Sequence, residues 1–563
     1  MAGIARITRG IRNAKRLAEV VRVLARHGFG EVVTRLHLLD AVPARLAAGL
    51  RLTPDSARAQ SSRGERLRAV LIELGPTFVK LGQVLSTRPD LIPPDICADL
   101  ETLQDRVPPV SNEEAAQVIL AELGRDPAEA FGSFDETPIA SASISQVHRA
   151  TLKDGTAVAV KVQRPGIASL IESDTELLGS IAEWLVERGI DTPGFDPVGT
   201  VEEFSRSVRR ELDFVHEART LERFTRNFDG SDIVHFPTVY SDLSTPRVLT
   251  MEWIAGTSLR DMDKLRRDGH DFGRIAHNGV EVVLKQVFEH GLFHGDPHPG
   301  NIFVLPGDAI CLIDCGMVGQ LMPDDTERFA DLLLAVFRKD TSQATSAVLE
   351  LAQTTSGTDR KALERDIHEF IESDAERMME GLAFGEALNR VVGILQEHGL
   401  VLPPRYTLLI KALATIEQVG RNLDPSLDIA SQIRPYVEEL LKRRYSARRV
   451  ASDVSAALWD MIKLGRSLPS DVRELVSSFR GGGFRITLRR EDIRLLTDSH
   501  ERSANRLTFG MIVGALIVGS SLLMRISGGP TFLGLPVIGF AGYLVAAVLG
   551  LGMVFSMWRS RRL

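Results

Sequence analysis

Residues 291–304 read GLFHGDPHPGNIFV, a short loop rich in polar side chains that runs directly into an apolar strand. Asp296 and Asn301 in this loop have the spacing Asp-x-x-x-x-Asn. A further acid, Asp314, ends the apolar stretch ICLID, thirteen residues after Asn301. Carboxylate and amide oxygens are the hard ligands that hold Mg²⁺ beside the phosphates of a nucleotide. The loop and the strand that follows it therefore predict a site for magnesium-dependent phosphoryl chemistry.

In protein kinases, the Asp of such a loop lies beside the attacking group, while the Asn and the later Asp hold metal ions. By this pattern Asp296 is the candidate catalytic residue, and Asn301 and Asp314 are the candidate metal ligands. The pattern also makes His294 a structural histidine that supports the loop. A metal role for His294 or His298 is the less favoured alternative.

Upstream, residues 156–166 read TAVAVKVQRPG and alternate as a strand does, with Lys161 near the end. The kinase lysine at this position pairs with nucleotide phosphates and with a helical glutamate. The stretch RRELDFVHEA offers Glu211, Asp213 and Glu217, on what we expect to be one long helix. On such a helix Asp213 and Glu217 share a face, from which Glu211 is displaced. One carboxylate can pair with Lys161, and a second on that face needs another cation.

A second strand, PRVLTMEWIAG at residues 246–256, is expected to supply the connection between two lobes. Its residues Glu252, Trp253 and Ile254 are predicted to face adenine through backbone groups, with Met251 behind the base. Strands with one helix come first and mostly helical sequence follows. This order predicts an α+β, two-lobed protein-kinase-like fold.

The segment before the Lys161 strand departs from the kinase pattern. A glycine-rich loop is expected there, but Ala140, Ser141, Ala142 and Ser143 stand where glycines would be. Each Cβ restricts the backbone and obstructs a close approach to phosphates. These four residues remain candidates for nucleotide binding, but the change argues against an ordinary protein kinase.

The two ends of the chain carry signals of a different kind. Residues 507–524 and 532–558 contain no charged side chain, and each is long enough to span about 30 Å of hydrocarbon as a helix. A buried hairpin in a soluble core is the less favoured alternative. Arginines flank the pair, so the positive-inside rule places both ends and the preceding domain on the cytoplasmic side. The basic first 30 residues have helical apolar spacing and no secretory apolar stretch; they fit a domain helix, a membrane-surface helix or a transit peptide.

Composition sets further limits. A chain of 563 residues is too long for a single hydrophobic core. Its net charge of −7 lacks the overall positive charge that is typical of nucleic-acid-binding proteins. Three cysteines, Cys97, Cys311 and Cys315, are too few for a disulfide framework, so we expect buried packing in a reducing compartment. Residues 51–65 are predicted to form a loop and residues 478–485 a linker.

Before the kinase-like core, residues 73–93 contain Lys80, Gly82 and Gln83. On spacing alone, Lys80 is a solvated charge on a helix. The stretch Lys80–Gln83, however, reads K-x-G-Q, and with the other motifs it resembles the UbiB (AarF) family of atypical kinase-like proteins. The family's alanine-rich loop stands at 140–143, slightly departed from A-A-A-S, and its E-x-D motif at 211–213. The similarity runs from about residue 16 to about residue 440.

The resemblance implies that the N-terminal extension folds over the active site and that Lys80 meets the E-x-D acids. It makes Lys80, Gly82, Gln83, Glu211 and Asp213 regulatory residues that limit protein phosphorylation, with Lys161, Glu217 and Asp296 as the catalytic set. It also implies Mg²⁺ and ATP or ADP as cofactors and an ATPase-like or kinase-like activity that supports ubiquinone biosynthesis. Expected partners are the lipid bilayer, prenylated quinone precursors and quinone-biosynthesis enzymes. The expected location is the bacterial inner membrane, with the kinase-like domain cytoplasmic.

We therefore expect a helical N-terminal extension at 1–112, a kinase-like N-lobe at 113–255 and a C-lobe at 256–445. A linker with a helical segment follows at 446–503, and a transmembrane helical hairpin at 504–563. Three alternatives stay open. A small-molecule or lipid kinase is suggested by H-G-D-x-x-P-x-N, a protein kinase is disfavoured by the missing glycines and Lys80, and a nucleotide-binding pseudokinase scaffold is disfavoured by the intact polar set.

Overall fold

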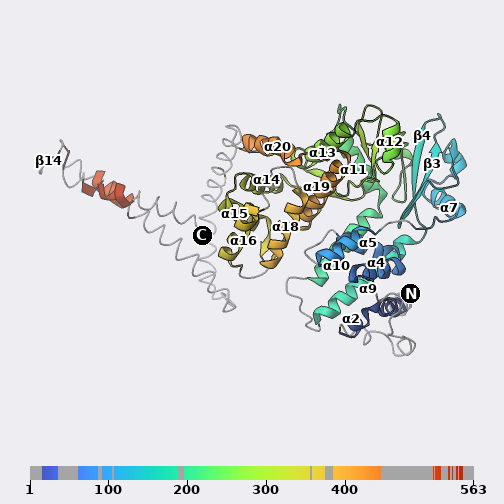
Figure 1. Ribbon diagram of the computed structural model, residues 1–563, viewed down its shortest axis with the longest axis horizontal. Helices are drawn as coiled ribbons and strands as arrows, with labels where there is room; N and C mark the ends of the chain where they lie inside the picture. The colour runs from blue at the N-terminus through green and yellow to red at the C-terminus, as the bar shows by residue number, and fades with distance from the viewer. Residues whose placement is uncertain are drawn as a thin grey trace, which may run out of the picture. The chain divides into compact units, whose positions relative to one another are not determined.

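The computed structural model describes residues 15–35, 61–86, 92–103, 107–187, 196–354, 358–373 and 384–444, followed by residues 459, 512, 514–521, 531–532, 535–536, 541–542 and 544–549. The chain divides into two compact units, Met1–Val450 and Ala451–Leu563. Figure 1 shows the elements of both. The candidate site residues all belong to the first unit.

An antiparallel sheet forms the N-lobe. Its strands follow the order β1-β3-β4-β6, with β2 on the side of β3; the strands are β1 (Ser133–Phe134), β2 (Ala140–Ser141), β3 (Ser145–Thr151), β4 (Ala157–Gln163) and β6 (Val248–Glu252). Val158, Val160 and Val162 pack against α7 (Asn112–Leu123) on one face. Because neighbouring strand residues point to opposite faces, Ala159 and Lys161 face away from α7. The alternation read from the sequence thus decides which side of the sheet receives the lysine.

Three α-helices follow β4 in the chain before β5 and β6: α9 (Ile167–Glu187), α10 (Pro197–Glu211) and α11 (Phe214–Asn227). The prediction of one continuous helix across residues 198–228 is wrong. Asp213 adopts an extended conformation, with φ −99° and ψ 96°, and its side chain accepts a hydrogen bond from Val215 N and caps α11. Asp is a strong N-cap residue because its carboxylate satisfies an amide that the first helical turn leaves unpaired. The break separates Glu211 from Glu217, so Asp213 and Glu217 do not share a helix face.

The N-terminal extension is helical in the parts described. Residues 15–24 continue into a π-helical turn, η1 (Ala25–Phe29), and α2 (Gly30–Arg35); α4 (Arg63–Leu74), α5 (Pro76–Ser86) and α6 (Pro94–Glu101) follow. Ser62 and Glu65 form a capping box that begins α4, so residues 63–65 are helical and not part of the predicted loop. α5 packs against α9 and α10, and these helices lie side by side in Figure 1. Arg16 fixes this group, donating to Asp174 Oδ1 at 2.8 Å and to the Leu74 carbonyl at 2.7 Å.

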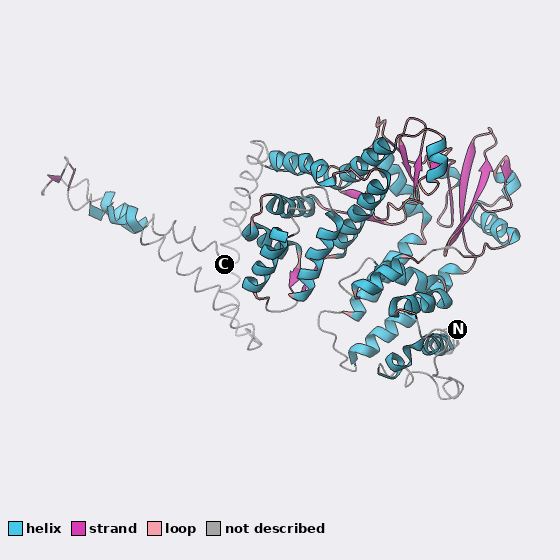
Figure 2. Cartoon of the chain, in the orientation of Figure 1, coloured by secondary structure: helices cyan, strands magenta, loops and turns pink. Residues whose placement is uncertain are grey.

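The C-lobe is mostly helical, as the sequence predicted, and Figure 2 shows most strands gathered at one side of the first unit. Its helices are α12 (Met262–Arg267), α13 (Phe272–Phe288), α14 (Pro323–Phe337), α15 (Thr341–Leu351), α16 (Arg360–Ser373), α18 (Phe384–Glu397), α19 (Pro404–Leu423) and α20 (Ile429–Arg444). α13 packs against α19 at the centre of the core. Short strands carry the loop near the site: β5 (Val234–His235), β7 (Thr257–Ser258), β8 (Leu292–His294), β9 (Ile302–Val304), β10 (Ile310–Leu312) and β11 (Val318–Gln320). The fold is therefore α+β and kinase-like.

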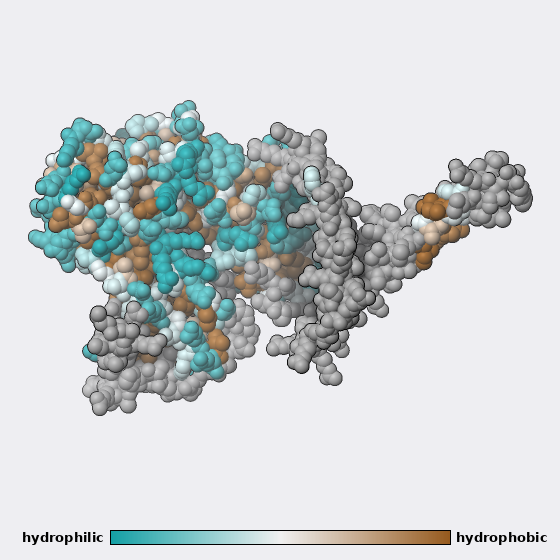
Figure 3. Space-filling view, turned by 180° about the vertical axis from the view of Figure 1, so that it is seen from behind, coloured by the Kyte–Doolittle hydropathy of each residue, from teal (hydrophilic) through white to brown (hydrophobic). Residues whose placement is uncertain are grey.

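The second unit holds the two apolar segments. In the described part of the chain, no helix is both long enough and apolar enough to cross a membrane. Residues 514–521 and 544–549 are helical, and Figure 3 shows apolar side chains on the surface of this described part. The expectation of helix from residue 532 is wrong at its start, since β14 (Thr531–Phe532) pairs with β15 (Leu535–Pro536). Proline disfavours helix at the preceding residue, here Leu535. The remainder of both segments, the linker at 478–485 and residues 1–14 lie outside the described residues.

Candidate functional site

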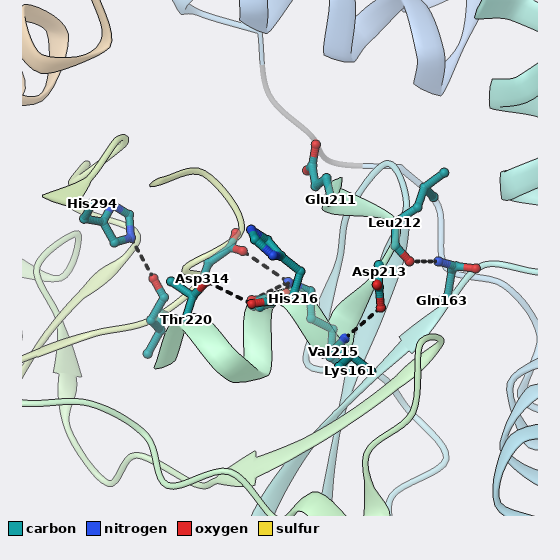
Figure 4. A network of polar contacts seen from close by, with 12 residues as sticks. Lys161, Gln163, Glu211, Leu212, Asp213, Val215, His216, Thr220, His294 and Asp314 are labelled. Carbon is teal, nitrogen blue, oxygen red and sulfur yellow. Dashed lines mark hydrogen bonds and ion pairs between the residues drawn. The ribbon is translucent and has the colours of Figure 1, made fainter. Parts of the chain in front are cut away.

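Lys161 is the centre of an ion-pair network that joins the two lobes (Figure 4). Its ammonium lies 2.8 and 2.9 Å from the two carboxylate oxygens of Glu217 on α11, and 3.1 Å from Asp314 Oδ1. Lys161 and Glu217 are buried, whereas the Asp314 side chain is 55% exposed. The network therefore leaves its acidic end accessible to a ligand.

Electrostatics favour the charged forms of Lys161 and Asp314, whereas burial raises the pKa of Glu217 against the opposing effect of Lys161. Burial alone would lower the pKa of Lys161, but the carboxylates of Asp314 and Glu217 together raise its pKa above the ordinary value. The Lys161 ammonium lowers the pKa of Asp314 well below its usual range, and Lys80 adds to the lowering. At neutral pH the site thus presents a protonated lysine beside an ionised carboxylate.

The loop after β8 is held by His294. Its Nδ1 accepts from the Asp296 amide at 3.1 Å, its Nε2 faces the Ile313 carbonyl at 3.2 Å, and its own amide donates to Gln286 at 2.9 Å. Burial lowers the pKa of His294, so the neutral ring uses one nitrogen as acceptor and the other as donor. With both nitrogens engaged inside the protein, His294 has the structural position that the sequence predicted.

Asn301 and Asp314 have the chemistry that a magnesium site needs. The Asn301 amide nitrogen donates to the Asp296 carbonyl at 3.1 Å, which leaves the amide oxygen as the ligand atom. Asp314 has a backbone φ of 57°, a left-handed conformation that costs a non-glycine residue of order 1–3 kcal/mol. Among the described residues, no group of three or more His, Cys, Asp or Glu side chains is arranged to hold an ion. The Asn–Asp pair fits a cation that takes its other ligands from phosphate and water.

The alanine-rich loop is tied to the protein by Arg164, a residue that the sequence reasoning missed. The Arg164 guanidinium donates to the Ala142 carbonyl at 2.8 Å, to Ser141 Oγ at 2.7 Å and to the Pro108 carbonyl at 2.7 Å. Ala140 and Ser141 form β2 at the sheet edge, and Ser143 is buried, with no hydrogen-bond partner for its hydroxyl in the described structure. Arg164 thereby links the loop to the segment that arrives from the extension. Its place directly after the Lys161 strand was the available signal.

The stretch predicted to connect the lobes begins as β6, which ends at Glu252. Met251 is buried, and the amides of Glu252 and Trp253 donate to the carbonyls of Thr238 and Ala157. The described hydrogen bonds do not use the Ile254 amide, which is therefore a candidate partner for adenine. The Glu252 carboxylate is engaged elsewhere, 2.8 Å from His235 Nε2. The adenine-facing role of this stretch stays a prediction.

Lys80 is not the solvated charge that spacing alone favours. It is buried on α5 and forms an ion pair with Glu211, at the end of α10. The Glu211 carboxylate points away from Lys161 in Figure 4, so the two acids of α10 and α11 serve different lysines. The expectation that Lys80 meets the E-x-D acids is therefore seen for Glu211, whereas Asp213 caps α11.

Gly82 and Gln83, the other two motif residues on α5, make packing and backbone contacts. A Cβ at Gly82 would overlap Leu71 and Leu103, so glycine permits the close packing of α5 against α4 and the end of α6. Gln83 is half-buried, and its carbonyl accepts from Ser86 Oγ at 2.8 Å. The cysteines are likewise buried and free, as expected.

Asp296 has a partner that no motif indicated. Lys411 on α19 places its ammonium 3.3 Å from Asp296 Oδ1, and His298 Nε2 lies 3.8 Å from Asp296 Oδ2. His298 itself accepts from the Gly300 amide at 2.9 Å, and burial lowers the pKa of the His298 imidazole. Lys411 lies far from the loop in sequence, so only the folded chain reveals the pair.

A small antiparallel sheet holding a lysine–glutamate pair, joined to a helical lobe that carries an Asp–Asn loop and a following Asp, defines a protein-kinase-like protein. The chain matches the family models of the ABC1 atypical kinase-like domain at residues 102–348, the UbiB helical domain at 367–428 and the ABC1/UbiB kinase-like C-terminal domain at 491–559. The chain belongs to the UbiB (ABC1) family of atypical kinase-like proteins, the ubiquinone-biosynthesis family.

The chain is also similar to individual proteins. The chain is 31% identical over 546 residues, 97% of this chain and 99% of the relative, to an "Uncharacterized protein in hydrogenase 1 5'region" of Clostridium pasteurianum. It is 37% identical over 441 residues to a "Probable protein kinase UbiB" of Pseudomonas putida (strain W619), covering 77% of this chain and 81% of that protein. A solved Mycobacterium tuberculosis structure, the complex of Rv3197 with erythromycin, is 26% identical, covers 65% of this chain and 94% of that one, and has a TM-score of 0.47.

Proposed function

We propose that this protein is a membrane-anchored, kinase-like ATPase that supports isoprenoid quinone biosynthesis and binds a magnesium nucleotide between its lobes. The observation that carries the proposal is the intact network of Lys161, Glu217 and Asp314, beside a loop that presents Asp296 and Asn301. A scaffold without turnover would not require this complete set. The same set is what phosphoryl transfer uses for positioning and charge stabilisation.

In this proposal each residue has one task. Lys161, held by Glu217, pairs with the nucleotide phosphates, and the backbone of residues 252–254 receives adenine. Asn301 and Asp314 would hold Mg²⁺, which when bound neutralises charge on the phosphate oxygens. Asp296 orients a water molecule and accepts its proton as the water oxygen bonds to the γ-phosphorus. The bond from that phosphorus to the bridging oxygen breaks, and ADP and inorganic phosphate leave.

The extension explains why water, rather than a protein hydroxyl, is the proposed acceptor. Lys80 is buried and paired with Glu211, and Glu211 Cγ lies 3.8 Å from the position of a Cβ on Gly316, two residues after Asp314. The Lys80–Glu211 pair therefore lies beside the site. A helix placed there takes space that a protein substrate would need. The same proposal includes a regulatory role for the K-x-G-Q segment. The segment fills space that a protein substrate would need, and Lys80 places a positive charge there.

Phosphate release by the purified full-length protein tests the proposal. We expect Mg-ATP hydrolysis that rises with anionic liposomes and a prenylated phenol and is lost in Asp314→Asn. If no phosphate is released with or without liposomes, or if release persists unchanged in Asp314→Asn, the ATPase assignment is wrong. Release without stimulation by liposomes would remove the membrane part of the proposal and leave the ATPase.

We also propose that residues 507–524 and 532–558 anchor the protein in the bacterial inner membrane, with the kinase-like unit cytoplasmic. Deletion of residues 504–563 is expected to leave Mg-nucleotide binding unchanged within about twofold, because the first unit ends at Val450 and contains every site residue. Thermal stabilisation by Mg-ADP, compared with the full chain in detergent, measures this. Loss of that stabilisation on truncation would show that the C-terminal unit contributes to the site.

A further inference from the structure

Lys411 is a cation at the reacting end of the site that no motif accounts for. Its ammonium is 3.3 Å from Asp296 Oδ1, and the two side chains are 21% and 30% exposed. A partly exposed ion pair of this kind contributes little to stability. Its accessibility instead leaves both groups able to exchange partners when a ligand arrives.

The helix that carries Lys411, α19, is held by core packing next to the loop that contains Asp296. α19 packs against α13 and β11, and its Leu409 and Leu413 are fully buried in the C-lobe core. Leu408, three residues before Lys411 and on the same helical face, contacts the position where a Cβ on Gly295 would lie, 2.9 Å away. The backbone of Lys411 is thus fixed relative to Asp296, and only its flexible side chain can move.

The loop itself lacks a cation. Between Asp296 and Asn301 the sequence reads PHPG, and its one titratable group is His298. Its Nδ1 accepts from the Gly300 amide, so this nitrogen carries no proton and the ring is neutral. Lys161, which contacts Glu217 and Asp314, is already assigned to the nucleotide phosphates. The Arg260 guanidinium packs against Gly300 in this loop, whereas the Lys411 ammonium contacts Asp296 itself. Lys411 is therefore placed to stabilise the charge that spreads over the γ-phosphoryl oxygens during transfer.

We propose that Lys411 is a catalytic cation supplied by the helical domain, a role that rests on and deepens the proposed ATPase function. Without nucleotide, its ammonium rests on Asp296. During transfer it moves to the oxygens of the γ-phosphoryl group, which releases Asp296 Oδ1 to accept the proton of the attacking water. Lys411 forms no covalent bond and loses no proton in this step. One residue thereby both stabilises the developing charge and frees the base when substrate is present.

The test compares affinity for Mg-ADP alone with affinity for Mg-ADP plus aluminium fluoride, a mimic of the transferring phosphoryl group. In the full-length protein, Lys411→Met removes the charge and keeps the stem, and Arg421→Met on the same helix is the matched control. We expect Lys411→Met to bind Mg-ADP within about twofold of the parent but to lose about tenfold or more of the tightening by aluminium fluoride. Lys411→Arg should restore most of it, and Arg421→Met should match the parent.

Full tightening in Lys411→Met would overturn the inference, as would a parent protein that shows no tightening at all. If Lys411→Met is too unstable to measure, Lys411→Arg and Lys411→Gln replace it, and equal tightening in those two overturns the inference as well. Phosphate release in the same samples separates the two proposals. A parent that hydrolyses ATP while Lys411→Met does so at the parent rate contradicts only the role of Lys411. If aluminium fluoride tightens Mg-ADP binding only when Lys411 is present, but the parent does not hydrolyse ATP, only the ATPase assignment is contradicted.

Discussion

Asp314→Asn is expected to abolish measurable binding of Mg-nucleotide while leaving the protein folded. The Asp314 side chain is half-exposed, so its replacement by a neutral isostere leaves no buried charge alone, but it removes the anionic metal ligand and one partner of Lys161. A ligand present at 100 times its Kd stabilises a protein by about 2.7 kcal/mol, and we expect this gain to fall to near zero in the variant. Thermal unfolding with and without Mg-ADP measures it.

Lys161→Ala is expected to lose nucleotide binding for a different reason, because it removes the cation that pairs with phosphate. It also leaves Glu217 buried without its partner, and such a loss costs about 3–5 kcal/mol. Lys161→Arg therefore accompanies it as a variant that keeps the charge, and Asp229→Asn, an exposed acid after α11, serves as the neutral control. Retained stabilisation by Mg-ADP in both Asp314→Asn and Lys161→Ala would contradict the nucleotide site.

Lys80→Ala is expected to loosen the extension and permit autophosphorylation that the parent lacks. The substitution leaves Glu211, a 24% exposed carboxylate, without the ion pair that the structure gives it. Loss of one partner from a buried pair costs about 3–5 kcal/mol, and partial exposure of Glu211 places the expected cost toward or below the lower end of that range. A hydroxyl of the protein itself can then enter the vacated space, and Asp296 can accept its proton as the oxygen bonds to the γ-phosphorus and ADP leaves.

Mass spectrometry after incubation with Mg-ATP measures this prediction, together with the affinities for ATP and ADP. The relative affinity of the two nucleotides should also change, because the Lys80 charge acts on Asp314. Lys153→Ala, an exposed lysine in the turn after β3, is the matched control and should behave as the parent does. If the Lys80→Ala protein carries no phosphate and has the parental nucleotide affinities, the prediction is wrong and Lys80 has only a structural role.

The sequence by itself determined those parts of the site that depend on short-range pattern. Period-two alternation placed Lys161 on one face of β4, and the loop spacing placed Asp296 and Asn301 together ahead of Asp314. The structural role of His294 could be predicted because its hydrogen-bond partners lie nearby in sequence: Gln286 precedes the loop, Asp296 is in it and Ile313 follows it. The two-lobed fold was predicted because strands come first in the sequence and mostly helical segments follow. Each of these features is fixed by bonds and side-chain directions within a few residues, which a linear pattern records.

Only the tertiary structure decided how remote charges pair. Helical periodicity predicted an unbroken helix through Asp213, because the sequence does not show whether a local capping bond will outcompete helix continuation. That break sends Glu211 to Lys80 and Glu217 to Lys161. Arg164 and Lys411 acquire their partners through the packing of helices and loops that are distant in sequence. An ion pair depends on the separation of two atoms in space, and the core contacts of α5, α10 and α19 set that separation.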